Sequence, residues 1–424
     1  MTGPVLPRRA LLAGSLALGL ARPAIAQARP RVVVVGGGFA GAIAARALVR
    51  LGVEATLVDP AAATGAGYVA CPFSNLVLGG LRTMADQRFG YDGVRRAGVT
   101  VAALAATGVD ATARRVRLAD GTDLPYDRLI LAPGVDMNFA ALPGYDAAAA
   151  EILPHAWKAG PQTERLARQL DAMPDGGTVL MAVPPVPYRC PPGPYERASL
   201  IAHWLKTHKP RSKLIVLDAK DQFSKQRLFE EAWKALYPGT LEWVGQSLGG
   251  RVTEVDVAGR TLVTEFDRHR GDVINVIPPQ RAGAIAAAAG VADRSGWCPV
   301  EPVGFESRLV PGVHVIGDAA IMGAMPKSAF AAADQARVCA RAVAALLAGG
   351  APATPKLANT CWSVVAPDYG ISVAGVYRPG PPGLLTDIDG AGGISPVGAA
   401  PAVRVAEAAH AASWFDGITA DAFG

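Results

Sequence analysis

A glycine loop near the start of the chain constrains its fold more than any other feature. Residues 31–41 read RVVVVGGGFAG, in which a run of valines leads into Gly36, Gly38 and Gly41 in GxGxxG spacing. The valines favour a buried strand, and the alanine-rich segment after the loop favours a helix. In a strand–loop–helix unit of this kind, the loop N–H groups and the helix N-terminus bind the pyrophosphate of a dinucleotide. The sequence therefore predicts a Rossmann-type dinucleotide-binding domain.

A second strand is expected over residues 54–59. It ends in Asp59, 18 residues after Gly41. An acid at this position commonly accepts hydrogen bonds from the adenosine ribose hydroxyls. Because strand, loop, helix and terminal acid occur in this order, a βαβ unit that binds nothing is the less favoured interpretation. We therefore expect the three loop glycines and Asp59 to bind the cofactor.

Two apolar strands further along the chain are expected to complete the same domain. One ends in Gly134 (YDRLILAPG, residues 126–134), and the other ends in Gly317 and Asp318 (VHVIGD, residues 313–318). In flavoproteins with two dinucleotide-binding domains, such segments close the FAD-binding domain, and the aspartate contacts the ribityl–phosphate region. Gly134, Gly317 and Asp318 are therefore further candidates for FAD binding.

The second glycine loop expected in such a protein is missing. The apolar strand Thr178–Val183 is followed by PPVPYRCPPGPYERA, with Cys190 near its centre. Proline has no backbone N–H group, so this segment cannot surround a pyrophosphate with donors. Asp218 ends the next strand, where a ribose-binding acid would lie, and we expect it to be a solvated strand end. The pattern predicts a flavin that works with a cysteine rather than a nicotinamide dehydrogenase.

These elements predict an α/β fold similar to that of glutathione reductase. It would have two Rossmann-type dinucleotide-binding domains and a C-terminal α+β interface domain. The FAD-binding domain is expected to be discontinuous, because its last strand follows the second βαβ unit. The expected boundaries are residues 31–145 and 295–350 for the FAD-binding domain, 146–294 for the second domain and 355–424 for the C-terminal domain.

The first 26 residues are expected to be an export signal. Arg8 and Arg9 precede the apolar run LLAGSLALGLA, and Ala24-Ile25-Ala26 offers a cleavage site of the A-x-A type. The arginine pair indicates the twin-arginine route to the periplasm, and an uncleaved membrane anchor is the alternative. The formal charge of +5 would fall to +2 without the three arginines of this leader. A charge this small does not favour nucleic-acid binding.

Cysteine usage excludes two kinds of metal site. The chain has five cysteines, and an odd number leaves at least one free, bound to another group or paired between chains. No Cys-x-x-Cys-His motif occurs, so this chain attaches no c-type haem itself, and no Cys/His cluster has zinc spacing. Cys298 and Cys339 are expected to be core thiols, with a structural bridge between them as the alternative.

Several segments resemble the flavoprotein subunit of flavocytochrome c sulfide dehydrogenases, which are related to the sulfide:quinone oxidoreductases. They span nearly the whole chain after the leader. The segments are YVACPFSNLVLGG (68–80), YRCPPGPYERAS (188–199), VINVIPPQRAG (273–283), GWCPV (296–300), IGDAAIMGAMPKSAF (316–330), NTCWS (359–363) and SWFDGITADAFG (413–424).

The resemblance implies roles for three cysteines. Cys71 would form a thioether with the 8α-methyl group of the flavin, and a free structural cysteine is the alternative. Cys190 and Cys361 would form a disulfide beside the flavin, although the sequence alone does not bring them together. A disulfide is an electrophile toward hydrosulfide, whose attack leaves a persulfide on one sulfur and a thiolate on the other. The thiolate can then pass two electrons to the flavin. An inert structural disulfide is the alternative.

Two charged residues are further catalytic candidates. Glu196 lies six residues after Cys190 near a helix start, where it could relay a proton as sulfide binds. A carboxylate that only favours the helix dipole is the alternative for Glu196. Lys327 begins another helix, and its ammonium group could face the flavin pyrimidine ring and stabilise the anionic reduced form. A surface lysine is the alternative for Lys327.

The implied function is oxidation of sulfide to sulfur or polysulfide in the periplasm. Electrons would pass through FAD to a separate c-type cytochrome subunit. A membrane-bound sulfide:quinone oxidoreductase is one alternative, and the short, mixed C-terminus disfavours it. A non-catalytic thiol-redox partner of a sulfur-carrier protein is the other, and sulfide alone would not turn such a protein over.

Overall fold

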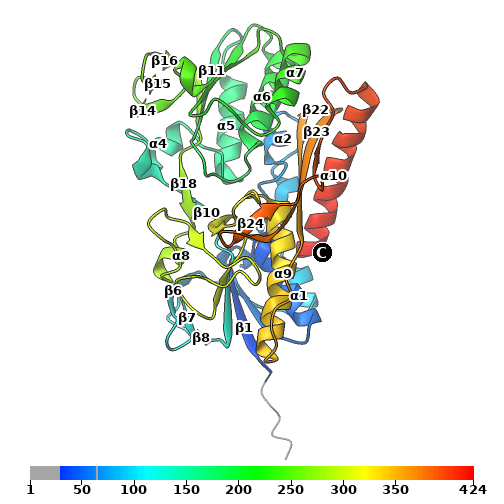
Figure 1. The fold of residues 1–424 in the computed structure, drawn as a ribbon. Helices are drawn as coiled ribbons and strands as arrows, with labels where there is room; N and C mark the ends of the chain where they lie inside the picture. The colour runs from blue at the N-terminus through cyan, green and yellow to red at the C-terminus, as the bar shows by residue number, and fades with distance from the viewer. Residues whose placement is uncertain (1–28, 64) are drawn as a thin grey trace, which may run out of the picture.

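Two parallel sheets and one antiparallel sheet form the framework of the molecule (Figure 1). The structure is a computed structural model that describes residues 29–63 and 65–424, so the predicted leader over residues 1–26 lies outside the described residues. No helix within the described ranges is long and apolar enough to cross a membrane. The mixed α/β fold predicted from the sequence is confirmed.

The first sheet is built around the valine run of the sequence. All five strands are parallel and lie in the order β20-β9-β1-β2-β5. Four consecutive valines of β1 are buried, as expected for a central parallel strand with both faces covered. The strands are β1 (Arg31–Val35), β2 (Glu54–Val58), β5 (Thr100–Ala102), β9 (Arg128–Leu131) and β20 (Val313–Val315).

Strand β20 joins this sheet although it begins 182 residues after β9 ends in the chain. Two alanine-rich helices, α1 (Phe39–Arg50) and α9 (Ala329–Leu347), pack against each other beside the sheet. Small alanine side chains let the two helices approach closely. The sheet therefore brings the start of α1 and the start of α9 toward the same place.

The second parallel sheet is interposed in the chain between β9 and β20. Its strand order is β13-β12-β11-β17. The strands are β11 (Thr178–Val183), β12 (Lys213–Asp218), β13 (Leu241–Val244) and β17 (Val273–Val276), and the accompanying helices are α5 (Pro161–Ala172), α6 (Gly193–His208) and α7 (Gln226–Leu236).

The C-terminal segment connects the two units. Its antiparallel strands β22 (Leu357–Ala366), β23 (Tyr369–Gly380) and β24 (Leu384–Asp387) follow one another in the sheet. Strand β22 contacts α6 of the second unit and α9 of the first. Helix α10 (Pro401–Phe423) covers β23 and reaches α1 (Figure 1).

The remaining elements are short. They are β3 (Tyr68–Val69), α2 (Ser74–Leu78), β4 (Arg88–Phe89), α3 (Asp92–Arg96), β6 (Ala106–Asp110), β7 (Arg115–Leu118), β8 (Asp123–Pro125), β10 (Val135–Met137), α4 (Ala147–Ile152), β14 (Val252–Asp256), β15 (Thr261–Thr264), β16 (Arg268–Arg270), β18 (Gln280–Ala282), α8 (Ile285–Ala288), β19 (Cys298–Pro299), β21 (Ala320–Ile321) and β25 (Gly393–Ile394).

Candidate active site

A cavity of about 460 Å³ lies where the three parts of the molecule meet. Its wall contains the glycine loop before α1, the end of β9, the loop before α2, the proline-rich segment before α6, the start of α9 and part of β22. Most of the predicted site residues line it. They are Gly36, Gly38, Asp59, Cys71, Gly134, Cys190, Glu196, Gly317, Asp318 and Cys361.

The glycine loop has the geometry that a bound pyrophosphate requires. Gly36 has φ +100°, and a Cβ atom there would lie 2.2 Å from the Ala132 carbonyl oxygen. A Cβ atom at Gly41 would lie 1.8 Å from the Gly36 carbonyl oxygen. Both positions therefore exclude any side chain. Gly41 itself does not line the cavity and allows the loop to pack against α1.

Asp59 follows directly after β2 and faces this loop. Its two carboxylate oxygens accept hydrogen bonds from the Gly37 N–H (2.5 Å) and the Ala61 N–H (2.7 Å). The carboxylate therefore fixes the glycine loop in addition to lining the cavity. Each oxygen keeps a second lone pair that can accept a hydroxyl hydrogen bond.

Asp318 presents an unsatisfied acceptor to the cavity. Its Oδ1 atom is buried and has no hydrogen-bond partner among the described residues. Burial raises the pKa of the Asp318 carboxyl, while the nearby Arg189 and Lys327 oppose this. A buried acceptor without a partner is costly, so this atom fits a donor supplied by a bound molecule, such as a ribityl hydroxyl of FAD. Together, the glycine loop, Asp59 and the Gly317-Asp318 turn fit FAD.

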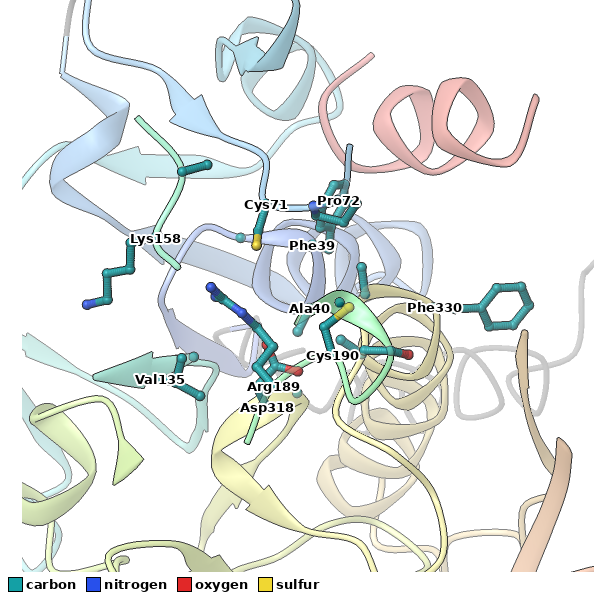
Figure 2. A pocket seen from close by; sticks show the side chains of 18 of the residues that line it. Phe39, Ala40, Cys71, Pro72, Val135, Lys158, Arg189, Cys190, Asp318 and Phe330 are labelled. Atoms are coloured by element: carbon teal, nitrogen blue, oxygen red, sulfur yellow. The ribbon is translucent and has the colours of Figure 1, made fainter. Parts of the chain in front are cut away.

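Three cysteines face the same cavity from different elements. Cys71 lies between β3 and α2, Cys190 lies before α6, and Cys361 lies on β22. Figure 2 shows the side chains of Cys71 and Cys190 at the cavity wall, with Arg189 extending toward Cys71. All five cysteines of the chain lie among the described residues, and all are free thiols in this structure. The predicted bridge between Cys190 and Cys361 is therefore absent from it, although both residues line one cavity.

Cys190 is held in an unusual backbone conformation. Its φ is +58°, in the left-handed region that non-glycine residues rarely adopt. Its N–H donates to the Lys327 carbonyl oxygen (2.8 Å), just before α9. Burial raises the pKa of the Cys190 thiol well above its usual value, and the nearby Cys361 and Glu196 act in the same direction. The surroundings thus fix the position of this sulfur and disfavour a negative charge on it.

Glu196 is buried in the first turn of α6. Its Oε2 accepts from the Asn75 side-chain amide (2.8 Å), and its Oε1 accepts from the Val364 N–H (2.9 Å), three residues after Cys361. Burial raises the pKa of this carboxyl. The carboxylate therefore connects α2, α6 and the cysteine-bearing strand β22. These hydrogen bonds go beyond a favourable interaction with the dipole of α6. The raised pKa of the carboxyl suits a group that accepts a proton.

Lys327 is placed differently from the sequence expectation. Its Nζ atom donates to the carbonyl oxygens of Asp318 (2.8 Å) and Ala320 (2.7 Å) and lies 4.0 Å from the Trp297 ring centroid. Burial lowers the pKa of Lys327 to about 8. These carbonyl groups and the ring attract the ammonium group away from the cavity wall, which is formed instead by the following residue, Ser328.

Asp218 is also placed differently from the expectation of a solvated strand end. It is completely buried and accepts hydrogen bonds from the Tyr195 O–H (2.6 Å) and Trp243 Nε1–H (3.0 Å). It also forms an ion pair with Lys220 (2.5 Å). Aromatic side chains have filled the space beside this strand, so the carboxylate is satisfied by the protein itself.

Several residues around the cavity were missed by the sequence analysis. Arg197 is buried and donates to the Asn75 side-chain oxygen (3.0 Å) and the His155 carbonyl oxygen (2.9 Å). Trp157 forms part of the wall, and Lys225 donates to the Cys361 carbonyl oxygen (2.9 Å). Arg197 falls within the recognised segment 188–199, but these partners of Arg197 and Lys225 come from distant parts of the chain. No group of His, Cys, Asp or Glu side chains in the described part of the chain could hold a metal ion.

Three family models match this chain. The model for pyridine nucleotide-disulphide oxidoreductases matches residues 30–171. The central model of the sulfide dehydrogenase (flavocytochrome c) flavoprotein chain matches residues 163–278. The flavin-binding model of flavocytochrome c sulphide dehydrogenase matches residues 353–423. The three matches follow one another along the chain and include the segments that bear Cys190 and Cys361.

Individual proteins are also similar to this chain, either in sequence or in structure. The chain is 53% identical over 49 residues to the "sulfide dehydrogenase [flavocytochrome c] flavoprotein chain" of Chlorobaculum thiosulfatiphilum; the match covers 11% of this chain and 94% of that sequence. The sulfide:quinone oxidoreductase of Aquifex aeolicus has a similar structure, with a TM-score of 0.69, 16% identity and 92% of each chain covered. An NAD-dependent persulfide reductase from A. fulgidus has a TM-score of 0.61 and 17% identity, covering 81% of this chain and 64% of that one. At these identities the structural similarities show the fold.

The family models and the Chlorobaculum relative agree with the cavity that combines an FAD-type glycine loop with cysteines. The chain therefore belongs to the flavoprotein chains of flavocytochrome c sulfide dehydrogenase, a family of FAD-binding, flavin-dependent sulfide dehydrogenases.

Proposed function

We propose that the chain oxidises sulfide through a redox-active Cys190–Cys361 pair and passes the electrons by way of FAD to a separate c-type cytochrome subunit. The observation that supports this most directly is that both cysteines line the cavity that contains the glycine loop and the unsatisfied Asp318 oxygen. Bound FAD would accept two electrons and release them one at a time. The cytochrome partner is suggested by the name of the Chlorobaculum relative.

The protein's own part in the reaction begins with the oxidised pair. Hydrosulfide forms a bond to one cysteine sulfur, the S–S bond breaks, and the other cysteine leaves as a thiolate. Glu196 is placed to accept the proton that the bound sulfur releases, because it lies between Cys190 and the strand of Cys361. When the persulfide and the thiolate together give up two electrons and one proton, a new S–S bond joins them through the transferred sulfur, and bound FAD would accept the two electrons. A second hydrosulfide then takes up this sulfur and leaves as hydrodisulfide, which restores the Cys190–Cys361 disulfide.

Cys71 is proposed to bind the flavin covalently through a thioether to its 8α-methyl group. The residue lines the cavity, and its Sγ atom contacts the Trp157 carbonyl oxygen (3.7 Å). Arg189 lines the same cavity, and its side chain extends toward Cys71 (Figure 2). Acid precipitation should leave yellow colour in the protein pellet. The Cys71→Ser variant should release its FAD into the supernatant, and release of all FAD from the wild type would refute the linkage.

The periplasm is the proposed location. The support is the order of Arg8-Arg9, the apolar run and the Ala24-Ile25-Ala26 cleavage site. Replacing the arginine pair by two lysines should retain the protein in the cytoplasm. Unchanged appearance of the Lys-Lys variant in the periplasmic fraction would exclude the twin-arginine route.

The decisive experiment for the redox function compares two cysteine variants. Under anaerobic conditions, sulfide should bleach the flavin of the wild type, and oxidised cytochrome c should then be reduced in the presence of the co-purified partner. Cys190→Ser should lose this activity, whereas Cys339→Ala, which removes a buried thiol on α9 away from the cavity, should retain it. Normal turnover of Cys190→Ser would overturn the proposal.

Structural similarity to the sulfide:quinone oxidoreductase of Aquifex aeolicus supports a second candidate acceptor. The same assay distinguishes the two if a short-chain quinone is offered beside cytochrome c. Rapid reduction of the quinone while the cytochrome stays oxidised would establish the quinone as acceptor.

A further inference from the structure

A lysine lies buried beside the cysteine pair and has no role in the function described so far. Lys225 immediately precedes α7 and is only 5% exposed. Its Nζ atom donates to the Cys361 carbonyl oxygen (2.9 Å), the Ser363 hydroxyl (2.8 Å) and, at 3.4 Å, the Ile371 carbonyl oxygen. All three partners are neutral oxygen atoms, so they do not neutralise the positive charge of the buried ammonium group. This charge can therefore act on other groups nearby.

The ammonium group lies on the same face of β22 as the Cys361 thiol. Side chains alternate along a strand, so residues 361 and 363 point to the same face. The burial pattern of β22 agrees, because Asn359, Cys361 and Ser363 are all buried. Since Nζ is bonded to the Ser363 hydroxyl, it is on the side of the strand from which the Cys361 sulfur projects.

The backbone at Lys225 indicates that this placement is enforced. Its φ is +64°, in the left-handed region that L-residues with a side chain seldom occupy. Such conformations persist where surrounding contacts determine them, and they concentrate at functional sites. Here the contacts are the hydrogen bonds to β22 and β23.

The charges that face Lys225 come from several elements. They are Cys361 on β22, Glu196 on α6, Cys190 before α6 and Glu407 on α10, and each of them raises the pKa of Lys225. Burial is the larger influence and lowers this pKa to about 8. The ammonium group is therefore charged at neutral pH and interacts with both cysteines.

We propose that Lys225 is a positioning residue of the cysteine pair: its ammonium group fixes the Cys361 strand and stabilises the negative charge that Cys361 carries when the pair is opened. This inference rests on the proposed role of the pair in sulfide oxidation. When hydrosulfide opens the pair, one cysteine becomes a persulfide and the other leaves as a thiolate. The charge belongs on Cys361, because the surroundings of Cys190 disfavour a thiolate there and Lys225 lies on the Cys361 side.

The test measures thiol ionisation without sulfide, so its outcome is independent of turnover. The full-length holoenzyme is reduced under anaerobic conditions and alkylated with iodoacetamide between pH 5.5 and 10, and the modification of Cys361 is followed by peptide mass spectrometry. Lys225→Met should move the midpoint for Cys361 upward by about one pH unit, which means alkylation about tenfold slower at pH 7. A purely structural role would change the rate equally at all pH values.

Two further variants make the result specific. Ser363→Ala removes one hydrogen bond of Lys225 but leaves the charge, so its midpoint should stay within about 0.3 pH units of the wild type. Lys225→Arg keeps a positive charge above pH 8, so its midpoint should not rise, and it supplies the test if Lys225→Met does not fold. A folded Lys225→Met protein with an unchanged midpoint, or a Lys225→Arg midpoint one unit higher, would overturn the inference. The proposed sulfide oxidation is tested separately, by the turnover of Cys190→Ser. A failure of that function can therefore be distinguished from a failure of the inference about Lys225.

Discussion

The two parallel units of this chain share a strand–helix–strand order. The place where a dinucleotide would bind borders a cavity in the first unit and is filled by protein side chains in the second. In the first unit, Asp59 follows β2, borders the cavity and accepts from two backbone N–H groups. In the second, Asp218 ends β12, is completely buried and is satisfied by Tyr195, Trp243 and Lys220. The same residue type at the same topological position borders the cavity in one unit and lies in the core of the other.

The difference arises from the loops that precede these acids. The glycine loop of the first unit carries no side chains at residues 36–38, so a ligand can approach its backbone closely. In the second unit, prolines and aromatic residues replace it, and the Tyr195 ring stacks on Phe223 with a centroid separation of 3.6 Å. The proline-rich loop instead delivers Cys190 to the cavity of the first unit. The segment that follows the first strand of the second unit therefore positions a thiol, whereas the corresponding segment of the first unit is a glycine loop.

The largest effect is expected when a side chain is added to the glycine loop of the first unit. Gly41→Ala places a Cβ atom on the Gly36 carbonyl oxygen and must displace the loop. The purified variant should contain less than about one tenth of the wild-type FAD, because overpacked positions relax by moving their surroundings. Gly90→Ala, which meets no atom within 4 Å, is the matched control. Full FAD occupancy of Gly41→Ala, measured by visible absorbance, would refute the described role of the loop.

The two aspartates give a direct test of the comparison. Asp218→Ala leaves Lys220 and Tyr195 without their buried partner and should lower the free energy of unfolding by about 3–5 kcal/mol. Asp59→Ala removes two bonds to backbone N–H groups and should cost only about 1–2 kcal/mol, while it weakens FAD binding. Denaturant titration of both variants measures the difference. Equal losses of stability would show that the two acids do not differ in the way described.

The sequence predicted the parts of this site that depend on local pattern. The valine run, the glycine loop and a helix start close to Lys327 could be predicted directly, because each is specified within a few residues. The direction of the Lys327 side chain could not, since carbonyl groups of residues 318 and 320 decide it. Lys225 gave no signal either, because its partners on β22 and β23 are more than 130 residues away.

The burial of Asp218 was missed for a related reason. An acid after a β-strand is usually solvated, and only the tertiary structure shows that Trp243 and Tyr195 reach it. Long-range contacts of this kind have no counterpart in a local pattern. The resemblance of whole segments to a family identified the cysteines instead, without placing them in space.

A smaller effect is expected at the junction between the two units. His155 is buried, its Nδ1 accepts from the Trp157 N–H (2.9 Å), and its carbonyl oxygen accepts from Asn275 of β17 (2.9 Å). Burial lowers the pKa of His155 from 6.5 to about 4. The unfolded chain therefore binds a proton that the folded protein resists, and this contribution should reduce stability as the pH falls from 6.5 to 4, by at most about 3 kcal/mol.

Unfolding measured between pH 4 and 7 would test this contribution against a matched variant. His155→Asn keeps a side-chain acceptor two residues before the Trp157 N–H but has no proton to bind, so its stability should depend less on pH in this range. An identical pH profile of the two proteins would show that the ionisation of His155 does not contribute to the pH dependence of stability.

The smallest expected effect, none at all, concerns nicotinamide nucleotides. The second unit has no glycine loop, its proline-rich segment lacks the N–H donors for a pyrophosphate, and its Asp218 is occupied by three protein partners. Mixed anaerobically with the holoenzyme, NADH or NADPH should leave the flavin absorbance unchanged, whereas sulfide added to the same sample should bleach it. The fold resembles that of an NAD-dependent persulfide reductase, so the absence of bleaching would follow from the filled second unit rather than from the architecture. Bleaching by NADH as fast as by sulfide would mean that this unit still binds a dinucleotide, and the contrast between Asp59 and Asp218 would lose its functional meaning.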